Sequence, residues 1–163
     1  MASEIGVQTI QHTNGTTAFT VNSSGYVARA KNAAFLAHTA SNATYNQDNV
    51  LGWDTEVFDS DSCFIPSTGI YTAPVNGIYC FNACILINTS GNYGVGIFYK
   101  NGASLVSFQG WSEGGVNKGS AVGSVTAQMN ASDTMSIYWY GSSYGQAYKG
   151  NYSHFSGHLL AAT

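Results

Sequence analysis

The 163 residues of this chain suffice for one domain with a hydrophobic core, yet charged residues make up only 8% of them, against about 25% in ordinary soluble domains. The polar surface must therefore consist of Asn, Ser, Thr, Gly and Tyr, which fits either an extracellular or virion-type surface or a surface largely buried in an oligomer. A net charge of −3 argues against a nucleic-acid partner, and the absence of any run of roughly 18 apolar residues argues against membrane insertion.

The first 30 residues differ in composition from the rest of the chain. VQTIQHTNGTTAFTVNSSGYV alternates weakly between apolar and polar residues, turns at NG and SG, and carries too little apolar mass for a core of its own. We predict a strand over Thr17–Val21 and expect this segment to become ordered only against a partner chain or a copy of itself. The sequence therefore predicts an attachment arm over residues 1–30 and a separate domain over residues 31–163.

From residue 31 onward, short apolar or alternating runs are separated by Gly, Asn and Ser, and no segment shows helical periodicity. Such spacing is typical of a β-sandwich or barrel. The pair Asn101-Gly102 is the strongest signal for a tight hairpin in the chain. We predict strands in this domain at Ala33–Ala37, Val50–Phe58, Ile70–Thr72, Gly77–Asn88, Val95–Lys100, Ala103–Trp111, Lys118–Met129, Thr134–Tyr140 and Phe155–Leu160.

The only two prolines lie in FIPSTGIYTAPVNGIYCF, residues 64–81. Pro66 presets the backbone of a turn that Gly69 closes, and Pro74 ends a short strand because it cannot donate a ladder hydrogen bond. Gly77 is expected in the next turn, where a side chain would cause strain. The stretch therefore predicts a strand, a turn and a second strand.

The segment TMSIYWY has two faces. One face is apolar, whereas the other carries tyrosines, which more often form a wet packing surface or an interface because each hydroxyl needs a partner. The apolar face consists of Met135, Ile137 and Trp139, and the second face of Ser136, Tyr138 and Tyr140. Together with the alternation in other strands, this predicts a core that contains Tyr79, Phe81, Met135, Ile137, Phe155 and Leu159.

The segment GSSYGQAYKGNYS, residues 141–153, is rich in Gly, Ser and Tyr and has no regular pattern. Binding loops favour these residue types, so Tyr144, Tyr148 and Tyr152 are candidate ligand-contacting residues. An ordinary mobile loop explains the composition equally well.

The sequence offers little for catalysis or for metal binding. No Gly-x-Ser-x-Gly elbow occurs, and the acidic residues gather in one run, DTEVFDSD. Two of these carboxylates could form a glycosidase pair, and several could bind calcium, but the EF-hand pattern is absent and a solvated strand end explains the run as well. We predict no enzyme activity, no catalytic residue and no cofactor, with calcium as a weak possibility at Asp54, Glu56, Asp59 and Asp61.

The cysteines and two of the histidines are expected to be structural. Cys80 and Cys84 share a strand face roughly 13 Å apart, too far for a disulfide, and Cys63 could meet only one of them. We therefore predict free thiols. His154 and His158 also share a strand face and lie too far apart to ligate one ion.

The motifs of the domain resemble a known family. Residues 64–81 closely resemble the signature of the complement-component-1q globular-head domain, a jelly roll of the tumour-necrosis-factor-like superfamily. AAFLAH resembles its opening strand, KNG its hairpin, MNASDTMSI its Leu-x-x-Gly-Asp-x-Val-x-Val segment with Ser132 in place of glycine, and FSGHLL its closing strand. The resemblance covers about residues 33–160, and the matching residues include Pro66, Thr68, Gly69, Tyr71, Thr72, Ala73, Pro74, Gly77, Tyr79, Phe81, Phe155 and Gly157.

This resemblance implies an all-β, ten-stranded antiparallel jelly roll and a homotrimer. A three-fold assembly buries part of one sheet against the neighbouring subunit, and rigid aromatic side chains do this at low entropic cost. By family analogy and face alternation, the candidate interface residues are Tyr138, Tyr140, His154, Phe155 and His158.

The arm resembles the N-terminal arm of bacteriophage virion fibre proteins, in which a succession of Thr-Ile-Gln, Asn-Gly-Thr, Phe-Thr-Val and Ser-Ser-Gly recurs. It implies that Ile5, Val7, Ile10, Phe19 and Val21 dock on the particle or pair between subunits. We therefore expect a non-enzymatic trimeric knob of a virion, made in the host cytoplasm, with other virion proteins and a host-surface glycan or protein as partners. It would serve as a tail or head fibre or as a capsid decoration. A free-standing carbohydrate- or protein-binding lectin-like protein of the same fold is the alternative, and a depolymerase is a third.

Overall fold

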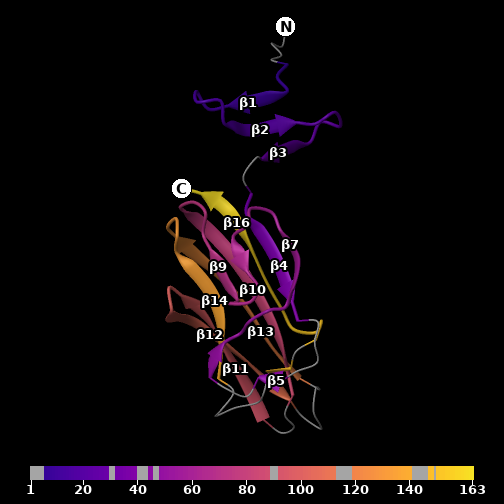
Figure 1. Cartoon of the computed structure of the whole chain (residues 1–163), viewed down its shortest axis with the longest axis vertical. Coiled ribbons are helices and arrows are strands. Elements are labelled where there is room, and N and C mark those ends of the chain that lie inside the picture. Colours follow the sequence, from indigo (N-terminus) through magenta and orange to yellow (C-terminus); the bar gives the residue numbers. More distant parts are fainter. Residues whose placement is uncertain are drawn as a thin grey trace. The chain divides into compact units, whose positions relative to one another are not determined.

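The structure is a computed structural model of the whole chain, and it describes residues 6–29, 32–39, 44–45, 48–88, 92–112, 119–140, 147–148 and 150–163. The elements in these residues are all strands (Figure 1). None of these residues belongs to a helix that could cross a membrane. The chain divides into two compact units, Met1–Asn32 and Ala33–Thr163, which are described separately below.

The first unit is a three-stranded antiparallel sheet of β1 (Thr9–Gln11), β2 (Thr17–Val21) and β3 (Val27–Arg29), in that order. Gly15 and Gly25 close its two turns with φ angles of 85° and 81°, which glycine adopts without steric cost. Only β2 was predicted. The sheet forms within one chain, and none of its described residues is buried, as the low apolar mass of this segment predicts. The expectation that the unit becomes ordered only against a partner stays a prediction.

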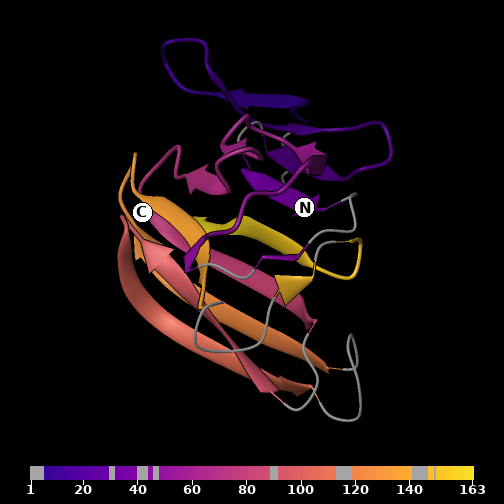
Figure 2. The same cartoon turned by 60° about the horizontal axis from the view of Figure 1, so that its bottom comes forward.

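The second unit is a sandwich of two antiparallel sheets (Figures 1 and 2). Its yellow C-terminal strand β16 lies between β10 and β4. The seven-stranded sheet contains β4 (Ala34–His38), β5 (Thr44–Tyr45), β7 (Thr55–Asp59), β10 (Gly77–Ile87), β13 (Gly119–Met129), β15 (Ala147–Tyr148) and β16 (His154–Ala162). The six-stranded sheet contains β6 (Asn49–Val50), β8 (Phe64–Ile65), β9 (Ile70–Thr72), β11 (Asn92–Lys100), β12 (Ala103–Ser112) and β14 (Thr134–Trp139). The predicted all-β, antiparallel class is confirmed.

One long predicted strand is in fact two short strands. The run Val50–Phe58 was predicted as continuous, but β6 ends at Val50 and β7 begins at Thr55. Between them, Leu51 and Trp53 are 3% and 2% exposed. The Leu51 amide donates to the Ile137 carbonyl at 2.8 Å, and the Trp53 amide to the Pro66 carbonyl at 2.7 Å. The link is therefore an irregular segment held in the core, and its alternating apolar residues imitate a strand in the sequence.

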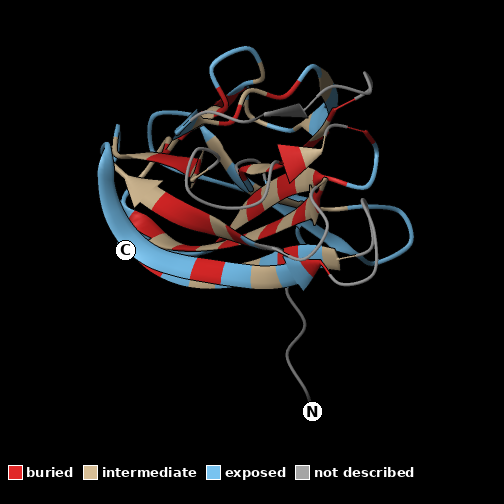
Figure 3. Ribbon diagram, turned by 90° about the horizontal axis from the view of Figure 1, so that it is seen from below, coloured by how far each residue is buried: buried red, intermediate tan, exposed pale blue. Residues whose placement is uncertain are grey.

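The core lies between the two sheets, where inward residues alternate with outward ones along each strand (Figure 3). Phe35 stacks on Phe64 and on Tyr71 with centroid distances of 4.4 and 5.0 Å, and Phe155 meets it edge-on at 5.0 Å. Burying aromatic rings of this size contributes much of the hydrophobic stabilisation of such a domain. The six predicted core residues are confirmed, since Leu159 is 9% exposed and the other five are 0% exposed.

Two glycines of the proline-containing stretch are required for different reasons. Gly69 closes the turn after β8 with φ at 68°, and its amide donates to the Ile65 carbonyl at 2.9 Å, as a turn at this position predicts. Gly77 lies inside β10 and not in a turn. A Cβ atom there would lie 2.6 Å from the Ala161 carbonyl oxygen of β16. The predicted backbone strain at Gly77 is therefore wrong, and the close approach of β16 is the reason for glycine.

Candidate binding surfaces

The acidic run after β6 shows a structural use of its carboxylates. Asp59 accepts the backbone N–H of Phe64 at 2.7 Å through Oδ2 and that of Asp61 at 3.3 Å through Oδ1, which fixes the link from β7 to β8. Glu56 is exposed on β7. Among the described residues, no group of three or more His, Cys, Asp or Glu side chains could hold a metal ion. Calcium at Asp54, Glu56, Asp59 and Asp61 stays an untested prediction.

The three cysteines are outside any disulfide, as predicted. Cys63 is buried, whereas Cys80 and Cys84 are partly buried on the outward side of β10. The Cys80 Sγ atom lies 4.0 Å from the Ser124 hydroxyl of β13. Cys80 and Cys84 therefore belong to an outward face of the seven-stranded sheet.

This outward face, which we call the histidine face, extends over β4, β16, β10 and β13. The register places His154 opposite both Cys84 and His38, and His158 opposite Cys80. None of its members is Asp, Glu, Lys or Arg. They are Leu36, His38, Cys80, Asn82, Cys84, Val122, Ser124, Thr126, His154, Ser156 and His158.

The electrostatics of the histidine face centre on one pair. Burial lowers the pKa of His154 because it disfavours the positively charged imidazolium form. The neighbouring His38 lowers this pKa further. Within the described part of the chain, the buried Nδ1 atom of His38 has no hydrogen-bond partner. The members of this face therefore include no carboxylate, ammonium or guanidinium group, and the surroundings of His154 favour its neutral form.

The six-stranded sheet presents a different outward surface, which we call the aromatic face. Tyr99 stacks on Tyr138 at 4.7 Å, and Tyr140 meets Tyr138 edge-on at 5.2 Å. Tyr93 stacks on Trp111 at 6.3 Å, with the two rings 15° from parallel. Burial raises the pKa of the Tyr138 hydroxyl above its usual value, and nearby Asp48 raises it further. The Tyr138 hydroxyl is therefore neutral at every physiological pH.

The structure does not bring the candidate interface residues together. His154 and His158 lie on the histidine face, whereas Tyr138 and Tyr140 lie on the aromatic face of the other sheet. Phe155 points inward, is 0% exposed and contacts Phe81 at a centroid distance of 6.1 Å. Phe155 is thus a core residue, and its assignment to a subunit interface is wrong.

The candidate ligand residues also differ in their surroundings. Tyr148 is part of β15, which pairs with the end of β10, and its side chain is partly buried. Tyr152 follows in a turn and is 65% exposed. Tyr144 lies outside the described residues. Residues 141–153 are thus not one continuous loop. Among the described residues of this segment, Tyr152 is the tyrosine whose side chain is clearly accessible.

Trp111, Tyr93 and Gln109 were not singled out from the sequence, although each lies in or beside a predicted strand. Trp111 is 53% exposed and lies opposite Tyr93 in the register. Alternation along β12 shows that Gln109 and Trp111 share one face and that Phe108, Gly110 and Ser112 share the other. It does not show which face points into the core. A tryptophan in a strand is usually expected to point inward, so the sequence alone would place Trp111 on the wrong side.

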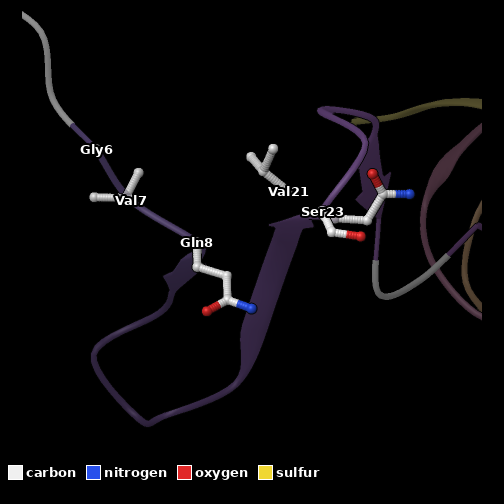
Figure 4. Close-up of a pocket in the computed structure, with 6 residues that line it drawn as sticks. Gly6, Val7, Gln8, Val21 and Ser23 are labelled. Atoms are coloured by element: carbon white, nitrogen blue, oxygen red, sulfur yellow. The ribbon is translucent and has the colours of Figure 1, made fainter.

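The first unit carries the candidate attachment residues. Val7 and Ile10 are 47% and 42% exposed, whereas Phe19 and Val21 are partly buried, and Ile5 lies outside the described residues. A hollow of about 370 Å³ is lined by Gly6, Val7, Gln8, Val21, Asn22 and Ser23. Figure 4 shows Val7, Gln8 and Val21 around it. The apolar side chains of this unit are therefore accessible to another chain.

Comparison with known proteins identifies the second unit. Residues 34–160 match the C1q domain family, so the match begins after the arm. The fold is similar to the globular domain of zebrafish complement 1qA protein, with TM-score 0.65, 16% identity, and coverage of 80% of this chain and 99% of that one. Eiger TNF from S. frugiperda has TM-score 0.65 and 14% identity, with coverage of 81% of this chain and 93% of that one. Murine APRIL has TM-score 0.60 and 10% identity, with coverage of 80% of this chain and 100% of that one. These likenesses confirm the jelly roll. No curated protein matches the sequence.

Proposed function

This chain belongs to the C1q domain family, and from that membership we propose that it is a non-enzymatic binding module that works as a homotrimer. Domains of the C1q and tumour-necrosis-factor-like kind are known as trimeric binding modules. The observation that carries the proposal for this chain is the histidine face, a wide sheet surface without a charged side chain.

Burial of the histidine face between subunits would cost little. Removing an unpaired charge from water costs several kcal/mol. None of the members of the histidine face is Asp, Glu, Lys or Arg, so its burial removes no permanently charged side chain from water. Val122 in the face is 65% exposed, and Phe58, opposite Leu36 on β7, is 48% exposed. Covering such apolar surface contributes about 25 cal/mol per Å². The charge content of 8% fits a chain with much of its surface buried in this way.

A closed three-fold ring needs two different patches on each subunit, because its contacts are heterologous. The second patch we propose is the edge of the sandwich at β12. Leu105 and Val106 are 43% and 42% exposed there, and β12 is the last strand of its sheet. We propose that the β12 edge of one subunit covers the histidine face of the next.

The test is a charge placed in the middle of the histidine face. Ser156 lies opposite Asn82 on one side and Leu36 on the other, so Ser156→Arg places an unpaired cation in the proposed interface. The matched control is Ser67→Arg, in the exposed turn between β8 and β9 and outside both proposed patches. Light scattering should give a trimer for the wild type and for Ser67→Arg and a monomer for Ser156→Arg, with circular dichroism showing that all are folded. A folded Ser156→Arg trimer, or a wild-type monomer, contradicts the proposal.

The absence of enzyme activity is part of the proposal. It is supported by the engagement of Asp59 with backbone amides, which removes one carboxylate from the only acidic run. We expect no turnover of polysaccharide or ester substrates. Turnover that disappears in Asp54→Asn or Glu56→Gln would contradict it.

We further propose that the module belongs to a bacteriophage virion, as a tail or head fibre or a capsid decoration made in the host cytoplasm. The support is the resemblance of the arm to virion fibre proteins and the accessibility of Val7 and Ile10 in a separate unit. Other virion proteins would hold the arm, and the jelly roll would contact a host-surface glycan or protein. Electron microscopy of purified particles labelled for this chain tests the proposal.

A free-standing lectin-like protein is the alternative, favoured by the exposed aromatic face, and unlabelled particles would support it.

A further inference from the structure

The end of the aromatic face next to residues 93 and 111 exposes two large rings side by side. Trp111 is 53% exposed and Tyr93 37% exposed. They are direct cross-strand partners on β11 and β12, with nearly parallel rings 6.3 Å apart. Exposed aromatic pairs of this kind mark interaction sites more often than chance surface residues do.

The rings adjoin a hollow that continues along the sheet. A space of about 490 Å³ is lined by Tyr93, Gln109, Gly110 and Trp111. A second space of about 380 Å³ is lined by Val95, Ser107, Phe108 and Gln109. Because Gln109 lines both, the two spaces form one elongated site. Each has the size of a small-molecule site, roughly 300–1,000 Å³, whereas a protein partner needs a surface of about 800 Å².

The site is built on a rigid part of the sandwich. A Cβ atom on Gly110 would collide with the carbonyl of Ser120, and one on Gly119 would collide with the carbonyl of Trp111. These two glycines let β12 and β13 approach closely, which fixes the backbone of Trp111 from behind. With this backbone fixed and the Trp111 ring stacked on Tyr93, the pair loses less conformational freedom when a ligand covers it than two unpaired rings would.

The chemistry of the lining selects the ligand class. An aromatic ring has an electron-rich face, which attracts the polarised C–H groups on the flat side of a sugar ring. The Gln109 amide offers both donors and an acceptor, and the Ser107 hydroxyl offers one of each, which suits the hydroxyl groups of a sugar. None of the described residues that line the two spaces has a charged side chain. Among these described residues, a phosphate or an acidic sugar would find no cation.

We propose that Trp111, Tyr93 and Gln109 form a binding site for a neutral oligosaccharide, with the sugar lying on the two rings and extending past Gln109 toward Ser107. This rests on the proposed function as a binding module and names the ligand class. A protein partner on the same rings is the competing outcome. The site lies on the aromatic face, whereas the proposed self-association uses the histidine face and the β12 edge at Leu105 and Val106.

The experiment begins with the full-length protein on an array of neutral and sialylated oligosaccharides. The neutral oligosaccharide that binds best is then titrated while tryptophan emission is followed. Trp53 and Trp139 are 2% and 0% exposed, so a change in emission reports Trp111. We expect saturable binding of a neutral sugar and about ten-fold weaker binding by Trp111→Ala and by Gln109→Ala. Trp111→Phe should retain part of the affinity, and Tyr26→Ala, at a 73% exposed aromatic position in the first unit, should retain all of it.

Light scattering on the same samples separates this proposal from the proposed function. A trimer that binds no array sugar, or that binds only acidic sugars, overturns the saccharide site and leaves the trimer standing. Unchanged affinity in Trp111→Ala overturns the site as well. Capture of an unglycosylated protein through Trp111, without sugar binding, assigns the rings to a protein partner and overturns the proposal. A monomer that still binds the sugar through Trp111 confirms the site and contradicts the trimer.

Discussion

At the scale of single residues, the turn between β13 and β14 shows how one side chain can conflict with its backbone. Ser132 adopts a φ of 73°, a left-handed conformation that costs a non-glycine residue roughly 1–2 kcal/mol. Its amide nevertheless donates to the Ala73 carbonyl at 2.8 Å, so the conformation is held in place. A glycine, which the family pattern has at this position, would adopt the left-handed conformation without this cost in free energy. The serine therefore marks a strained backbone position, which the spacing of the motif does not reveal.

The same turn is held by Asp133, whose carboxylate binds three groups. It accepts the Asn101 side-chain amide at 2.8 Å and the Asn130 backbone N–H at 2.9 Å, and it lies 3.0 Å from the Lys100 ammonium. The hydrogen bond from Asn101, the one from Asn130 and the proximity of Lys100 lower the pKa of Asp133 to about 2. The turn therefore stays tied to the β11–β12 hairpin at every pH at which Asp133 is ionised.

We predict that Ser132→Gly stabilises the protein by about 0.5–1 kcal/mol. The change removes the left-handed penalty, and the greater freedom of glycine in the unfolded chain offsets part of this gain. Ala131→Gly, one residue earlier and without a positive φ, is the matched control and should destabilise. Chemical denaturation of both variants measures the difference, and a destabilised Ser132→Gly would show that the serine side chain contributes more than the strain costs.

A second prediction concerns the centre of the aromatic core. Phe81 is 0% exposed, and its ring lies 5.4 Å from Tyr71 and 6.1 Å from Phe155. Phe81→Ala should cost about 3–5 kcal/mol, because it leaves a cavity that rigid neighbouring rings cannot fill. Ile65→Ala, at a 53% exposed position of β8, should cost about 0.5 kcal/mol or less. Equal thermal midpoints for the two variants would contradict this description of the core.

At the scale of strands, long alternating runs could be predicted and short ones could not. The 11 residues of β10 alternate strictly between buried and partly buried, so their period is visible in the sequence. Strands β5, β8 and β15 have 2 residues each, too few to show any period. They exist because neighbouring strands offer them hydrogen bonds, as β9 does for Phe64 and Ile65. Register is likewise a tertiary property, which is why the pairing of His154 with His38 could not be predicted.

That pairing of β16 with β4 predicts a pH dependence. The pKa of His154 is lower in the folded protein than its ordinary value of 6.5, because of burial and then because of His38. The unfolded chain therefore binds more protons in the window just below pH 6.5, so stability must fall as the pH drops through it and stay level above it. Protonation also adds charge to the histidine face, which weakens association in the same direction.

We therefore expect the thermal midpoint of the wild type to decrease between pH 7 and pH 5 and that of His154→Gln to decrease less. His158→Gln, four residues along the same face, is the control for the loss of an imidazole. Light scattering over the same range should show trimer dissociation at higher pH for the wild type than for His154→Gln. Identical pH profiles for the wild type and His154→Gln would show that this histidine does not couple folding to pH.

At the scale of the whole molecule, the fold of the domain could be predicted because its signals are local. Proline, glycine and aromatic residues at fixed spacing define the turn between β8 and β9 and the start of β10. The binding surfaces could not be predicted in the same way. They depend on which sheet a face belongs to, so Tyr138 and His154 were placed on one surface although they lie on different sheets. Phe155 was assigned to both the core and an interface, and only the packing decides between them.

The last prediction concerns the division of the chain between its two units. The core contains no described residue before Ala33, whose carbonyl accepts the Leu159 amide at 2.8 Å, whereas residues 6–29 of the arm include exposed apolar side chains and no buried residue. Deleting residues 1–30 should therefore leave a soluble jelly-roll trimer whose thermal midpoint changes little, since no core contact is lost. The same protein should fail to attach to the virion, because Val7, Ile10, Phe19 and Val21 are gone. Light scattering measures the first result and a particle-incorporation assay the second. A monomer would place the subunit contacts in the arm, and normal incorporation would place attachment in the jelly roll.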